Sequence, residues 1–114
     1  MIGFKTSTTY GITKCHPAEL GQEFYQLCNR WQGIVDGKHV TVYAGALRHN
    51  PARGVLLMRS LPADSRRLGG RHCRIPPNCG ALEIIEVRGN RLRVAMANGG
   101  DFWFEIPAAL RQAA

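Results

Sequence analysis

The chain has 114 residues, of which 45% are hydrophobic and 20% charged, and its formal net charge is +7. This length supports one modest core and excludes two, and the ordinary composition argues against extended disorder. No apolar run approaches the roughly 18 residues that span a bilayer, and residues 1–14 lack the apolar stretch of a secretory signal. We therefore expect a single domain over residues 1–114 in the cytoplasm, or outside the cell if the chain is the mature part of a precursor.

An irregular arm followed by a helix is predicted for the N-terminal quarter of the chain. Residues 1–14 are rich in Thr and Gly and show no clear period, which indicates an arm or an irregular edge strand. From residue 16 onward the apolar side chains recur at i, i+4, i+7 and i+11, as Leu20, Phe24, Leu27 and Trp31. This spacing predicts an amphipathic helix over residues 16–30 that covers one side of a sheet.

Antiparallel β structure is predicted over residues 31–106. Asp36-Gly37 stands between two apolar runs and favours a type I′ hairpin turn. The clearest pattern lies at residues 81–106, where three strand-like runs are separated by Gly89-Asn90 and by Asn98-Gly99-Gly100. A proline follows the last run, and residues 107–114 are expected to form a C-terminal turn.

The fold class expected from these elements is mainly β with a short N-terminal helix. Six or seven short strands in an antiparallel meander predict a strongly bent sheet or a small, partly closed barrel, because closure hides edge strands. The alternative is an open sheet with the helix packed across one face. Residues 55–58 and 81–87 are apolar on both faces, so either the sheet closes or a second copy covers it in a homodimer.

Positive charge is concentrated between residues 48 and 74, where seven arginines stand against Asp64 alone. Such a field attracts an anionic partner, either nucleic acid or an acidic protein. The plainer explanation is a solvated face in a chain that uses Arg for 12 of its 15 basic residues. The candidate polyanion-binding arginines are Arg48, Arg53, Arg59, Arg66, Arg67, Arg71 and Arg74, together with Arg91 and Arg93 on the later strands.

Two aromatic side chains are candidate anchors for the same partner. Alternation places Trp103 on the face opposite Phe102 and Phe104, beside Arg91 and Arg93 of the neighbouring strand, and Tyr43 opposite the Val40–Val42 face. Exposed aromatic rings interleaved with arginine hold single-stranded nucleic acids by stacking and phosphate contacts. The competing interpretation, which we favour, is that a partner subunit or the core covers these rings.

The four cysteines leave three alternatives open. Free or buried thiols are the first, and disulfides such as Cys15–Cys28 and Cys73–Cys79 are the second. Zinc is the third, but none of the cysteine spacings forms the short knuckle of usual zinc sites. We therefore predict no metal and no other cofactor.

Catalytic signals are few, since the chain has no nucleophile-elbow, zincin or phosphate-loop motif. A hydrolase would need Cys73 with His49, or the pair Glu83 and Glu105, and nothing local supports either arrangement. A second alternative is a barrel that binds a small apolar ligand, lined by Val42, Leu57, Leu92, Val94, Phe102 and Phe104. The prediction adopted is a non-catalytic binding module with a basic surface and an anionic partner.

Overall fold

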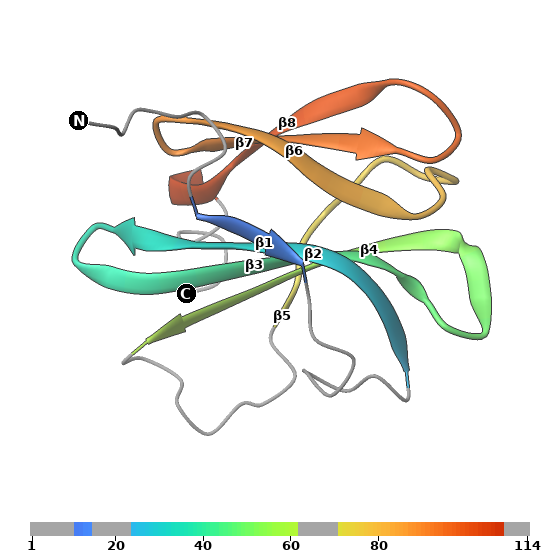
Figure 1. Cartoon of the computed structure of the whole chain (residues 1–114), viewed down its shortest axis with the longest axis horizontal. Coiled ribbons are helices and arrows are strands. Elements are labelled where there is room, and N and C mark those ends of the chain that lie inside the picture. The colour runs from blue at the N-terminus through green and yellow to red at the C-terminus, as the bar shows by residue number, and fades with distance from the viewer. Residues whose placement is uncertain (1–10, 15–23, 62–70, 109–114) are drawn as a thin grey trace.

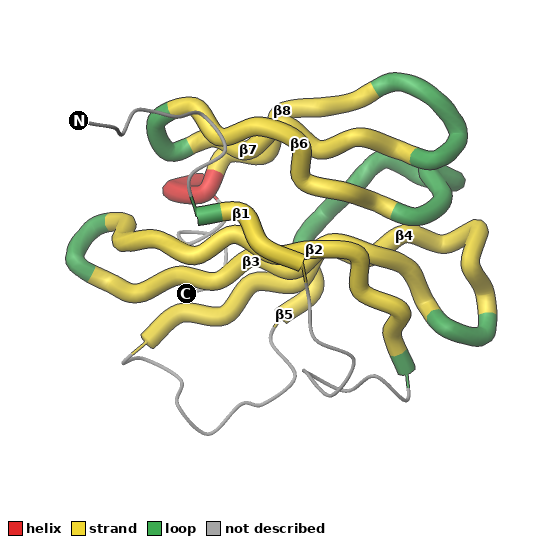
Figure 2. The backbone as a smooth tube through the Cα atoms, viewed as in Figure 1, coloured by secondary structure: helices red, strands yellow, loops and turns green. Residues whose placement is uncertain are grey.

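The computed structural model describes residues 11–14, 24–61 and 71–108, which form two antiparallel sheets that lie one above the other (Figure 1). The five-stranded sheet follows chain order, with β1 (Ile12–Lys14), β2 (Tyr25–Val35), β3 (Lys38–Leu47), β4 (Asn50–Leu61) and β5 (Arg71–His72). The three-stranded sheet contains β6 (Leu82–Arg88), β7 (Arg91–Met96) and β8 (Asp101–Glu105). One helical turn follows at residues 106–108, red in Figure 2. None of the helical structure described has the length and apolar character needed to cross a membrane.

The predicted hairpin turns are confirmed. Asp36 and Gly37 have φ angles of 52° and 76°, as a type I′ turn requires, and they join β2 to β3. Gly89 has a φ of 60° at the turn between β6 and β7, the conformation of the first central residue of a type II′ turn. The alternating runs on either side of these turns pair as antiparallel strands, so most of the region 31–106 folds as its pattern predicts.

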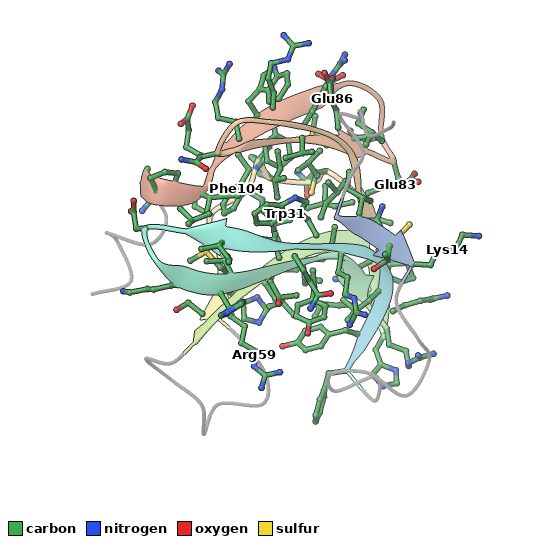
Figure 3. The ribbon with its side chains drawn as sticks, turned by 60° about the vertical axis from the view of Figure 1, so that its left-hand side comes forward. Lys14, Trp31, Arg59, Glu83, Glu86 and Phe104 are labelled. Atoms are coloured by element: carbon green, nitrogen blue, oxygen red, sulfur yellow. The ribbon has the colours of Figure 1, made fainter. Side chains whose placement is uncertain are left out.

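The core lies between the two sheets, as Trp31 and Phe104 illustrate in Figure 3. The five-stranded sheet contributes mainly Trp31, Val35, Val40, Val42, Ala44, Leu56 and Met58. The three-stranded sheet and its flanking residues contribute Cys79, Leu82, Ile84, Leu92, Val94, Phe104 and Ile106. Burying each of the larger aliphatic side chains contributes about 1.5 to 3 kcal/mol, so this shared cluster is the main attraction between the sheets.

Asn29 links the two sheets through its side chain. Its Nδ2 donates to the carbonyl oxygen of Ile84 at 2.8 Å, and its Oδ1 accepts from the Ile84 N–H at 3.0 Å. β6 is an edge strand, so the buried amide of Asn29 supplies hydrogen bonds that a neighbouring strand would otherwise give. The register shifts beside Asn29 and beside Ile84, and such bulges redirect side chains.

The predicted helix over residues 16–30 is wrong wherever the structure describes it. Residues 25–30 belong to β2 and pair with β3, whereas residues 16–23 lie outside the described part of the chain. The spacing of Leu27 and Trp31 fits one face of a helix, but pairing with β3 makes this segment a strand, and the bulge between Leu27 and Asn29 places the two side chains on opposite faces of it. Within the predicted arm, residues 12–14 form the edge strand β1.

The sequence predicts six or seven strands in one bent sheet or partly closed barrel, but the described strands form two sheets and no barrel closes among them. Residues 73–81 connect β5 to β6 outside both sheets. Pro76 and Pro77 in this connection have no N–H to donate to a strand ladder, which explains why pairing ends there. The helical turn at 106–108 overlaps the predicted C-terminal turn, whose residues 109–114 are not described.

Candidate functional site

Charge is divided unevenly between the two sheets. The described residues of the five-stranded sheet, its turns and the connection as far as Gly80 carry one carboxylate, Asp36, and eight basic residues. These are Lys14, Arg30, Lys38, Arg48, Arg53, Arg59, Arg71 and Arg74. Residues 81–108 carry four carboxylates and three arginines, so among the described residues the positive excess belongs to the five-stranded half.

The arginines of the three-stranded sheet are occupied by its own carboxylates. Arg93 lies 2.7 Å from Asp101 and 3.3 Å from Glu86, and Arg91 lies 3.8 Å from Glu105. Hydrogen bonds to Asp101 and Glu86 raise the pKa of Arg93. Exposed pairs of this kind contribute little stability, but they commit Arg91 and Arg93 to partners on their own sheet.

Trp103 and Tyr43, the two predicted aromatic anchors, have opposite environments. Trp103 lies beside Arg93 in the ladder and is 36% exposed, with the Arg88 and Arg91 guanidinium carbons 5.7 Å and 5.0 Å from its ring centroid. Cation–π contacts of this length hold the ring in place. Tyr43 is only 5% exposed, so it cannot serve as a surface anchor.

A cleft of about 810 Å³ is lined by residues of β4 and of the connection from β5 to β6. The course of this connection from the five-stranded to the three-stranded sheet can be followed in Figure 1. The apolar lining of the cleft includes Leu47, Val55, Leu56, Ile75, Pro76 and Pro77. Its polar lining includes Asn50, Arg53, His72, Arg74 and Asn78, all exposed, and among the described residues no Asp or Glu contributes to it. Val55 and Leu56 follow each other on β4, point to opposite faces of the sheet and are 3% and 0% exposed, so the accessible apolar surface of the cleft is the wall of Ile75, Pro76 and Pro77.

Backbone hydrogen bonds hold the wall of the cleft against β4. The Cys73 N–H donates to the Leu56 carbonyl at 2.8 Å, and the Gly80 N–H donates to the Ala52 carbonyl at 3.0 Å. A Cβ atom at Gly54 would overlap the Gly80 carbonyl oxygen, so only glycine allows this close approach. The connection is therefore attached to β4 at both of its ends, and backbone hydrogen bonds fix the wall of the cleft.

The turn between β7 and β8 supports the same wall from the other sheet. The Asn98 side chain donates to the Asn78 carbonyl oxygen at 2.6 Å, and the Asn98 N–H donates to the Cys79 carbonyl at 3.2 Å. Asn78 has a φ of 52°, a left-handed conformation that asparagine tolerates better than most residues. The hydrogen bonds of Asn98 thus fix the bend that brings the connection past the cleft.

Arg53 and Arg74 are the two predicted arginines that the fold brings together in this cleft. Within the described residues neither forms an ion pair. Arg48 donates to the Tyr25 carbonyl at 3.5 Å, outside the cleft lining. Arg59 extends away from the core in Figure 3, and its Nε is buried without a hydrogen-bond partner. Arg71 lies in β5, and Arg66 and Arg67 fall outside the described part of the chain.

His72 connects the cleft to the outer face of the five-stranded sheet. The Tyr25 hydroxyl lies 3.0 Å from Nε2 of His72, and the two ring centroids are 5.8 Å apart. Tyr25 belongs to β2 and His72 to β5, so this contact spans β3 and β4. It holds an exposed imidazole ring at the rim of the cleft.

The six candidates for an apolar ligand cavity do not share one lining. Val42, Leu92, Val94 and Phe104 are members of the packed core, and Phe102 packs against it. Leu57 pairs with Tyr43 and lies outside that cluster, on the other face of the sheet. The structure therefore does not assemble the cavity that this alternative requires.

The hydrolase candidates are also separated. Glu83 lies on β6 and Glu105 on β8, the two edges of the three-stranded sheet, and Glu105 pairs with Arg91. Cys73 lies in the cleft wall, whereas His49 is exposed in the turn between β3 and β4, outside the cleft lining. Neither predicted pair is brought together by the fold.

The structure describes three of the four cysteines, and each of them is present as a thiol. Cys79 is buried with a free thiol, so the Cys73–Cys79 disulfide does not form, and Cys28 also has a free thiol. Cys15 lies outside the described residues. Among the described residues, no group of three or more His, Cys, Asp or Glu side chains is placed to hold a metal.

The cleft itself is the feature that sequence reasoning missed. Residues 76–79 carry the signal of a turn, which says nothing about a wall that packs beside β4. The concentration of arginines over residues 48–74 includes both Arg53 and Arg74, but it does not point to Asn50, His72 or Asn78, the other polar residues of the lining.

Comparison with protein-family models, with curated proteins and with solved structures finds no match to this chain. The division of charge and the cleft are therefore the observations from which its function is inferred.

Proposed function

We propose that this protein is a non-catalytic module that binds nucleic acid through the basic half formed by the five-stranded sheet and the cleft beside β4. The observation that carries the proposal is the pair Arg53 and Arg74, which line one cleft to which no carboxylate of the described residues contributes. A guanidinium that has no protein partner remains able to bind a phosphate through two parallel hydrogen bonds.

The contrast between the two sheets supports this assignment. On the three-stranded sheet, Arg91 and Arg93 already contact Glu105, Glu86 and Asp101, so a phosphate would have to compete with them. On the five-stranded half, basic residues outnumber the single described carboxylate eightfold. An anionic polymer is therefore attracted to one side of the molecule, and its approach is steered by that field.

The test is the salt dependence of binding to a labelled single-stranded oligonucleotide of about 12 nucleotides, a length within the range that small modules cover. Fluorescence anisotropy should show binding that weakens steeply between about 50 and 200 mM salt, because phosphate contacts release counterions. Replacing Arg53 or Arg74 with Gln should reduce the slope of log affinity against log salt by about 0.7 for each lost contact.

Arg88→Gln is the matched control, because it removes the same charge from the three-stranded sheet at an exposed position. It should leave the salt slope nearly unchanged. Absence of oligonucleotide binding at low salt would end the proposal, and tighter binding to an acidic peptide of equal charge would replace nucleic acid by an acidic protein as the partner.

A further inference from the structure

We infer that the cleft beside β4 seats one unpaired nucleotide of a single strand, with the phosphate at Arg53 and Arg74 and the base against the apolar wall of Ile75, Pro76 and Pro77. This inference rests on the proposed function and adds to it the kind of nucleic acid and the place where it binds. The cleft volume of about 810 Å³ lies within the range of typical ligand pockets, roughly 300 to 1,000 Å³.

The concave shape favours a single strand over a duplex. In a double helix the bases are paired and stacked, so the rigid phosphate backbone meets the protein first and the bases cannot enter a pocket. In a single strand a base is free to turn out of the stack, and its faces and edges become available. The apolar wall of Ile75, Pro76 and Pro77 matches the face of such a base.

The polar rim matches the remaining chemistry of a nucleotide. The side-chain amides of Asn50 and Asn78 each offer donors and an acceptor, the combination that base edges require. Arg53 and Arg74 come from opposite walls, the strand and the connection, so a phosphate between them would contact both sides of the cleft.

His72 supplies a ring on which the base or its neighbour in the strand can stack. The ring is exposed at the rim, and Tyr25 holds it through the 3.0 Å contact to Nε2. A ring restrained before the ligand arrives loses less conformational entropy on binding. Histidine is among the aromatic side chains on which single-stranded bases stack.

An acidic peptide would use only part of this surface. Carboxylates would satisfy Arg53 and Arg74, but an acidic peptide brings no planar group to the apolar wall or to the His72 ring. Base dependence therefore separates the two partners, whereas salt dependence alone does not.

The experiment compares a single-stranded oligonucleotide with an abasic one of the same length and charge, using anisotropy at one fixed low salt concentration. The base-bearing strand should bind about tenfold more tightly, because stacking of a base is lost in the abasic strand. A duplex of the same sequence should bind more weakly than the single strand. Equal affinity for the base-bearing, abasic and duplex ligands would overturn the inference and leave the proposed function standing.

Three variants localise the effect to the cleft. His72→Ala should reduce the preference for the base-bearing strand, and His72→Phe, which keeps a flat ring, should restore most of it. Arg53→Gln should lower the affinity for the base-bearing and the abasic strand by the same factor, since both strands carry the same phosphates. If neither His72→Ala nor His72→Phe changes the preference for the base-bearing strand, the base is not seated in this cleft. If the unaltered protein binds none of the oligonucleotides, the proposed function itself fails.

Discussion

The side chain of Asn29 binds the backbone N–H and C=O of Ile84 at the edge of β6, where a neighbouring strand would otherwise bind them. Its side-chain donor and acceptor both bind Ile84, and only 7% of the residue is exposed to solvent. No pattern in the sequence identifies this contact, because the two residues are far apart in the chain and an asparagine in a strand has no preferred partner.

Replacing Asn29 with Ala should therefore lower the free energy of unfolding by about 3 kcal/mol, because two buried backbone groups lose their partners at about 1 to 3 kcal/mol each. Urea denaturation followed by circular dichroism measures this change. Gln32→Ala, at an exposed position of the same strand, should stay within about 0.5 kcal/mol of the unaltered protein. Equal losses in the two variants would refute the linking role of Asn29.

Cys28 offers a second test at single-residue scale. Partial burial, followed by the negative charge of Glu83, raises the pKa of its thiol from the ordinary value of a cysteine. Since the thiolate is the reactive form, alkylation of Cys28 near pH 8 should be slower than that of an unfolded cysteine and should accelerate as the pH rises. Mass spectrometry of iodoacetamide adducts gives the rate at each pH.

Glu83→Gln should speed this alkylation near pH 8, because removal of the negative charge lowers the pKa of the thiol. Glu105→Gln makes the same change in charge at the opposite edge of the sheet and should have no effect. A rate that is insensitive to Glu83→Gln would show that its charge does not reach Cys28.

At the scale of elements, the turns and alternating runs were sufficient to predict most strands, and the failures have physical causes. Asp36-Gly37 fixes a hairpin locally, so no distant information is needed. The spacing of Leu27 and Trp31 fits a helix, and it cannot show the pairing with β3 or the bulge that makes this segment a strand. Alternation likewise placed Tyr43 on the correct face but could not show that this face is covered.

The close contact of β4 with the connection depends on Gly54. An added Cβ would overlap the Gly80 carbonyl and lie 2.7 Å from the Cys79 sulfur. Gly54→Ala should therefore cost about 2 to 3 kcal/mol of unfolding free energy, as overpacking does. Gly89→Ala should cost only about 1 kcal/mol, because that glycine has a positive φ but no atom within 4 Å.

Thermal and urea unfolding of both variants measure the difference. A Gly54→Ala protein as stable as the Gly89→Ala protein would mean that the connection moves aside easily, and the wall of the cleft would then be adaptable.

At the scale of the whole molecule, the fold separates charge that is mixed along the chain. The sequence predicts the basic segment 48–74, but it places Arg91 and Arg93 in the same candidate set as Arg53 and Arg74. The structure divides them, since Arg91 and Arg93 contact carboxylates on the three-stranded sheet and the other two line the cleft. Which arginines have carboxylate neighbours depends on strand register, and composition cannot show it.

Trp103 marks the competing surface. It is exposed on the three-stranded sheet beside Arg88 and Arg91, so it combines the aromatic and basic features that were expected of a binding face. The arginines around Trp103, however, already form ion pairs with Glu86 and Glu105. An anionic strand would therefore gain little attraction there.

Binding of nucleic acid in the cleft beside β4 can be tested by a nuclear magnetic resonance titration of the ¹⁵N-labelled protein with the single-stranded oligonucleotide. We expect the largest shifts at the backbone amides of the non-proline residues in 50–56 and 72–79 and at the Arg53 and Arg74 side chains, while the Trp103 indole signal stays in place. Shifts concentrated at Trp103 and along β8, with the cleft unchanged, would contradict this expectation and assign binding to the three-stranded sheet.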